Sequence, residues 1–90
     1  MDSTLDQACD LAFGRVIWRG TLSDDERGLV AADVEAIYRD EMKTEHGTVF
    51  GRTIYDAARV LRQRIGGQDA LPGYARCLAA GRDRAAARRA

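Results

Sequence analysis

Apolar residues recur at three- and four-residue steps along most of this 90-residue chain, and this spacing constrains the fold more than any other feature. In an α-helix the spacing places apolar side chains on one face, whereas a half-buried strand alternates apolar and polar residues. No segment shows such an alternation, and no longer internal repeat is visible. The sequence therefore predicts an all-α fold.

Start and stop signals divide the chain into four predicted helices, covering about residues 4–19, 24–45, 49–65 and 71–80. The clearest start is Ser23 followed by Glu26, which is the pattern of a capping box. Glycines are expected to end the helices, at Gly20, His46–Gly47, Gly66–Gly67 and Gly81. The short connections predict a small up-down helical bundle of three long helices plus a shorter fourth, with an orthogonal arrangement as the alternative.

The apolar stripe of each predicted helix identifies the expected core. The residues expected to face inward are Leu5, Cys9, Ala12, Phe13, Val16 and Ile17, then Val30, Val34, Ile37 and Tyr38, then Phe50, Ile54, Ala57, Ala58, Leu61 and Ile65, and finally Tyr74, Ala75, Cys77, Leu78 and Ala79. Both cysteines belong to this set, so Cys9 and Cys77 are predicted to be buried, unreactive thiols.

The end of the chain differs from the rest in composition. Residues 82–90 carry four arginines and one aspartate, without any large apolar residue that could dock on a core. Alanine and arginine favour helix, but a short helix without packing is only marginally stable. The sequence therefore predicts one helical domain over residues 1–81 and a basic, frayed tail over residues 82–90.

Composition also bears on where the protein works. No basic segment leads into an apolar run after Met1, and no stretch approaches the ~20 apolar residues of a membrane span. The two cysteines form neither a disulfide framework nor a metal-binding spacing. A cytoplasmic protein without a membrane partner is expected. The excess of arginine over lysine, with abundant alanine and glycine, indicates a bacterial or phage source.

The residues for catalysis are sparse. The single histidine, His46, falls at a predicted helix end, where a cation is favoured by the helix dipole. No glycine-rich phosphate loop and no nucleophile beside a histidine is present in the sequence. We therefore predict a protein that is not an enzyme and has no catalytic residue, cofactor or metal ion. Glu41 lies within the apolar stripe of the second helix, which requires either an exposed last turn or a buried arginine partner.

Charge is distributed unevenly between the two halves. Residues 1–45 hold eleven acidic and five basic side chains, whereas residues 46–90 hold three acidic and nine basic ones. The two halves can neutralise each other within the fold, and they can also offer charged surfaces to partners.

The leading functional hypothesis is a small protein–protein interaction module, such as an adaptor, a subunit or an inhibitor of the kind that phages and plasmids encode. One candidate surface is the acidic outer face of the second helix, with Asp33, Glu35 and Asp40, which would suit a partner with a basic groove. The other is an apolar ridge formed by Leu11 and Trp18, unless the fourth helix or the tail covers it. A second copy of the chain, forming a homodimer, is another candidate partner.

The alternative hypothesis is a nucleic-acid-binding regulator. The candidate residues are Arg52, Tyr55, Arg59 and Arg62 on the third helix and Arg82, Arg84, Arg88 and Arg89 in the tail. Asp56 lies among the helix residues and can pair with Arg52 or Arg59, so a solvated, salt-bridged face is the other interpretation of that helix.

Overall fold

The computed structural model describes residues 3–44 and 50–89, with the backbone alone at residues 3, 41–44 and 50–52. Its elements are α1 (Ser3–Phe13), α2 (Arg15–Gly20), α3 (Asp24–Thr44), α4 (Phe50–Arg64), the 3₁₀ turn η1 (Gln68–Ala70) and α5 (Leu71–Arg89). The predicted all-α class is confirmed, since the described residues contain no strand. His46 and the side chain of Glu41, for which the sequence predicted roles, lie outside the described residues.

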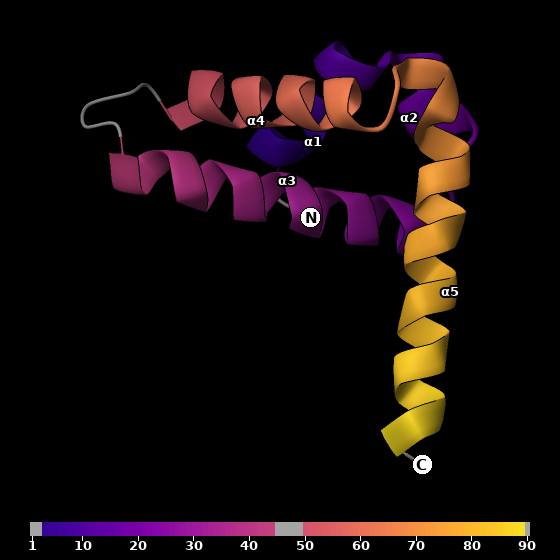
Figure 1. Cartoon of the computed structure of the whole chain (residues 1–90). Coiled ribbons are helices and arrows are strands. Elements are labelled where there is room, and N and C mark those ends of the chain that lie inside the picture. The colour runs from indigo at the N-terminus through magenta and orange to yellow at the C-terminus, as the bar shows by residue number, and fades with distance from the viewer. Residues whose placement is uncertain (1–2, 45–49, 90) are drawn as a thin grey trace.

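The helices form a layered core with one crosswise member. Helices α3 and α4 run antiparallel and side by side, and α1 packs against α4 (Figure 1). Helix α5 leaves the end of this layer crosswise and contacts α3 near the start of that helix (Figure 1). The up-down arrangement therefore holds for α3 and α4 and not for α5.

The predicted first helix is two helices, because Gly14 interrupts it. Gly14 has a φ of 87°, in the left-handed region that costs other residues about 1–2 kcal/mol. The break rotates the side chains that follow it, so Val16 is 79% exposed although its spacing predicted an inward position. Trp18 is turned into the core instead and is fully buried.

The predicted start of α3 is confirmed in its details. The Glu26 backbone amide donates to the Ser23 hydroxyl oxygen at 3.2 Å, and the Ser23 amide donates to the Glu26 carboxylate at 2.9 Å. These two hydrogen bonds form the capping box that the sequence predicted. The Ser23 amide is also the main reason that the pKa of the Glu26 carboxyl is lower than its usual value.

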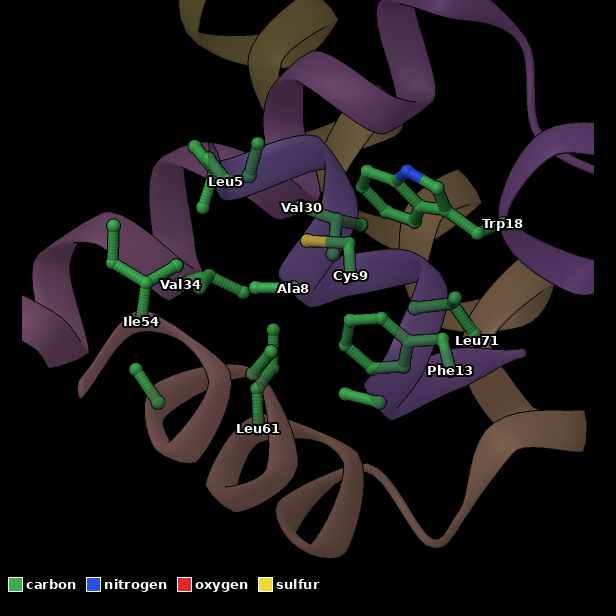
Figure 2. Packing of buried hydrophobic residues seen from close by; sticks show 14 of the residues in the cluster. Leu5, Ala8, Cys9, Phe13, Trp18, Val30, Val34, Ile54, Leu61 and Leu71 are labelled. Carbon is green, nitrogen blue, oxygen red and sulfur yellow. The ribbon is translucent and has the colours of Figure 1, made fainter. Parts of the chain in front are cut away.

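The core is assembled from α1 to α5, and Figure 2 shows its centre. Cys9 is fully buried there, and its pKa is raised to about 12 by burial, with smaller contributions from Asp6 and Asp10. The predicted burial of Cys9 is confirmed, and the raised pKa disfavours the thiolate, which is the nucleophilic form. The burial predicted for Cys77 is wrong, since α5 presents that side chain to solvent.

The glycines predicted to end helices on either side of α5 differ in outcome. Gly66 and Gly67 have φ values of 94° and 106° and end α4 as predicted. Gly81 does not end α5, which continues to Arg89. A glycine inside a helix costs only about 1 kcal/mol, and the alanines and arginines that follow favour helix. The fraying of residues 82–90 and the domain boundary at residue 81 remain predictions.

Candidate functional site

The last turns of α5 form the longest unbroken run of exposed residues in the described part of the chain. Every residue from 82 to 89, which we call the α5 arm, is exposed, and the arm projects beyond the other helices (Figure 1). Its cations are Arg82, Arg84, Arg88 and Arg89. Among the described residues none of these four side chains has a hydrogen bond or an ion pair. They are therefore available to an external anion.

The arginines of the α5 arm divide between two sides of the helix. At about 100° per residue, Arg84 and Arg88 lie four positions apart and share one side. Arg82 and Arg89 lie seven positions apart and share another side, more than about 100° away. The arm can therefore present two positive charges to each of two partners or surround one anionic backbone.

The arginines of α4 are mostly engaged within the molecule. The Arg62 guanidinium donates to the carbonyl oxygen of Ala12 at 2.7 Å, which satisfies the end of α1. Arg59 lies 3.7 Å from the Asp56 carboxylate, in agreement with the pairing that the sequence predicted. Tyr55 is half-buried against the core, and the side chain of Arg52 lies outside the described residues. The structure therefore does not assemble the predicted α4 residues into a free cationic row.

The predicted acidic triad of α3 is divided as well. Asp33 and Asp40 lie seven positions apart and line the same groove. Glu35 projects from a different side of α3 and forms an ion pair with Arg39 at 2.7 Å. The three carboxylates therefore do not form a single docking face.

The groove lies where α3 and α4 meet η1 and the start of α5, and its volume is about 770 Å³. Its apolar lining comes mainly from Ile37, Leu61 and Ile65. The charged residues around it are Asp33, Asp40, Asp69 and Arg64. We call this feature the acidic groove, because three carboxylates accompany one cation.

One hydrogen bond joins the walls of the acidic groove. The Tyr74 hydroxyl of α5 donates to an Asp33 carboxylate oxygen of α3. Burial, followed by this hydrogen bond, raises the pKa of Tyr74 to about 12, so the phenol remains a neutral donor at physiological pH. Sequence reasoning missed this pair because 41 positions separate its members. Asp40 and Asp69 are exposed and have no ion pair among the described residues.

The proposed apolar ridge is contradicted by the position of Trp18. Its indole ring stacks on Phe13 with ring centroids 5.8 Å apart, and its N–H donates to an Asp6 carboxylate at 3.0 Å. Leu11 is 72% exposed and therefore does not share a surface with Trp18. Trp18 is buried, because the break at Gly14 turns this residue inward.

A salt-bridge network closes the corner between α1 and α2. The Arg19 guanidinium donates to both carboxylate oxygens of Asp10 at 2.8 Å and also to Asp6. The Nε–H group of Arg19 is shared between the two Asp10 oxygens, and Nη2 lies 2.7 Å from one of them. These hydrogen bonds raise the pKa of Arg19, with the bond to Asp10 as the largest cause. The network stabilises the corner and leaves Arg19 unavailable to a partner.

The described residues place no three side chains of the histidine, cysteine, aspartate or glutamate types where they could share a metal ion. Comparison of the chain with models of protein families, with curated proteins and with solved structures gave no match. The two candidate surfaces are therefore the α5 arm and the acidic groove.

Proposed function

We propose that the protein is a non-enzymatic binding module that attaches to the phosphate backbone of a nucleic acid through the α5 arm. The observation that carries this proposal is that Arg82, Arg84, Arg88 and Arg89 are exposed on a projecting helix without an internal partner. Other arginines of the molecule, such as Arg19 and Arg62, are held by internal acceptors.

The chemistry of the α5 arm suits a phosphate backbone. Guanidinium groups donate in pairs to phosphate oxygens and release condensed counterions when they do so. Three alanines separate Arg84 from Arg88, so a polyanion can approach this side of the helix without steric obstruction. Contacts to phosphate carry no information about the bases, so the expected binding is independent of base sequence.

The test is titration of a fluorescent 20-base-pair DNA duplex with the full chain at several salt concentrations. Four arginine–phosphate contacts should give a slope of about −3 to −4 in a plot of log K against log salt concentration. Replacing all four arm arginines with alanine should remove measurable binding. Binding that persists with an unchanged slope in that variant would exclude the arm.

The matched control removes arginines elsewhere. Arg15 and Arg39 are exposed and lie outside the arm, so changing both to alanine should leave the salt slope within about 0.5 of the original. The variant with Arg88→Ala and Arg89→Ala loses the same charge, and its slope should be less negative by about 2. Equal slopes for the two variants would indicate attraction to the whole molecule rather than to the arm.

A second candidate function is protein binding at the acidic groove. The observation that favours it is an open groove with an apolar lining and with Asp40 and Asp69 exposed beside it. A basic segment of a partner protein would fit this chemistry. The Asp40→Arg, Asp69→Arg variant should lose that partner in affinity capture from host extract, and Glu35→Arg should retain it.

A further inference from the structure

The acidic groove and the α5 arm carry opposite charges at opposite ends of one helix. The groove includes Gly73 and Tyr74 near the start of α5, whereas the arm occupies residues 82–89. A continuous helix cannot bring its own end back to its own start. A second copy of the chain can satisfy both surfaces at once, because a two-fold axis places each arm beside the other copy's groove.

One side of α5 connects the two surfaces. At about 100° per residue, Gly73, Cys77, Gly81, Arg84 and Arg88 fall within an arc of about 80°. Four of these residues are exposed and Gly81 is partly exposed. The first three have small side chains, which allow a second helix to approach closely, and the last two supply charge. We call this side the α5 contact face.

We infer that two copies of this chain pair through the α5 contact face in antiparallel orientation, so that Arg84 and Arg88 of each copy enter the acidic groove of the other. A two-fold axis that passes the α5 contact face at the height of residue 79 places Arg84 opposite Tyr74 and Arg88 opposite Ala70. Both opposing positions line the groove. The inference rests on the protein-binding candidate and specifies a second copy as the partner. In the dimer Arg84 and Arg88 are engaged, and Arg82 and Arg89, on another side of each arm, stay available to phosphate.

The charges of the two surfaces are complementary. Asp40 and Asp69 are exposed without an internal ion pair among the described residues, and each can accept two guanidinium hydrogen bonds. The Asp33 carboxylate accepts from Tyr74 and retains further acceptor capacity. The methylene groups of arginine can cover the apolar lining of the groove while the guanidinium reaches the carboxylates.

Sedimentation equilibrium of the full chain should show a concentration-dependent monomer–dimer equilibrium. The Arg84→Glu, Arg88→Glu variant should raise the dimer dissociation constant by about tenfold or more, because like charges then face each other. The Arg82→Glu, Arg89→Glu variant makes the same charge change on another side of the arm and should dimerise normally. A strictly monomeric chain at about 1 mM, or equal losses in both variants, would overturn the inference.

Complementary charge exchange tests the pairing directly. Two double variants are compared, one with Asp40→Arg and Asp69→Arg and the other with Arg84→Glu and Arg88→Glu. Each variant should be monomeric alone, and an equal mixture of the two should form heterodimers. Failure of the mixture to associate would overturn the inference, provided circular dichroism shows both variants to be helical. A monomeric wild-type chain that still captures a host protein through Asp40 and Asp69 would overturn the dimer and preserve the protein-binding candidate.

Cys77 provides a native probe of the same interface. It is exposed near the centre of the α5 contact face, whereas Cys9 is buried. A short bis-maleimide should therefore join two wild-type chains through Cys77, and the Arg84→Glu, Arg88→Glu variant should lose most of this product. Cross-linking that is equal in both proteins, or that survives Cys77→Ser, would contradict the proposed pairing.

Discussion

The corner formed by residues 3–27 and the α5 arm use arginine in opposite ways. In the corner, Arg19 binds two carboxylates, and Arg27 donates to the Arg19 carbonyl at 3.4 Å and pairs with Asp24. In the arm, four arginines share eight residues with one aspartate, and among the described residues none has an internal acceptor. The same side chain stabilises the fold at one end and leaves charge available for binding at the other.

The comparison shows how a structural cation differs from a candidate binding cation. The structural cation has an acceptor within the fold, whereas the candidate binding cation is exposed and has none among the described residues. Arg62 illustrates the structural use, because it lies on the side of α4 expected to bind nucleic acid and donates to Ala12 instead. If this distinction holds, substitutions in the corner lower the free energy of unfolding and substitutions in the arm do not.

The largest effect should come from the centre of the corner. Trp18→Ala should lower the free energy of unfolding by about 3–5 kcal/mol, because it leaves a cavity beside Phe13 and removes the hydrogen bond to Asp6. Chemical denaturation measures the loss. Val16→Ala, at a neighbouring position that is 79% exposed, should change stability by less than about 0.5 kcal/mol. Similar effects for both variants would contradict the inward rotation of Trp18.

Gly14→Ala should lower the free energy of unfolding by about 1–2 kcal/mol, because alanine rarely adopts a positive φ. The added methyl group would also collide with the Gln68 side-chain amide. Gly28→Ala is the matched control, since open space surrounds Gly28 within α3, and it should raise stability by about 0.5–1 kcal/mol. A thermal melt that places Gly14→Ala above the wild type would show that the corner is not broken there.

Ser23→Ala should lower the free energy of unfolding by about 1 kcal/mol through loss of the cap of α3. Ser23→Asp retains an acceptor oxygen and should remain within a few tenths of a kcal/mol of the wild type. Urea denaturation of the three proteins measures both differences. Equal midpoints for Ser23→Ala and the wild type would place the start of α3 elsewhere.

Glu26 should make a smaller and pH-dependent contribution. Its pKa in the folded protein is below the usual 4.5, so its ionised form adds stability above about pH 4.5. That contribution is lost as the pH falls through the folded-state pKa. The wild type should therefore lose stability relative to Glu26→Gln as the pH falls below about 4.5. A difference between the two proteins that stays constant over this range would exclude the ionised capping box.

The smallest effect on folding should come from the arm. Changing Arg82, Arg84, Arg88 and Arg89 to alanine should alter the free energy of unfolding by less than about 0.5 kcal/mol, because these side chains are exposed and unpaired. The same variant is expected to lose DNA binding. A large loss of stability on denaturation would show that the arm belongs to the folded core, and the comparison with the corner would fail.

Local features of the sequence determined the helical class, the start of α3 and the end of α4. Helical periodicity is a property of neighbouring residues, and the Ser23–Glu26 cap is completed within three positions. Gly66 and Gly67 likewise act through their own backbone conformation. Such signals need no knowledge of the rest of the fold, which is why they could be predicted.

The tertiary structure decided which surfaces remain available. Trp18 is buried because Gly14 breaks the first helix, and the Asp33 carboxylate accepts a hydrogen bond from the distant Tyr74 of α5. The acidic groove exists only because α5 leaves the helical layer crosswise. The identity of each of these residues can be read from the chain, but its partner cannot. The groups that bury or bind it lie many positions away and meet it only after the helices pack.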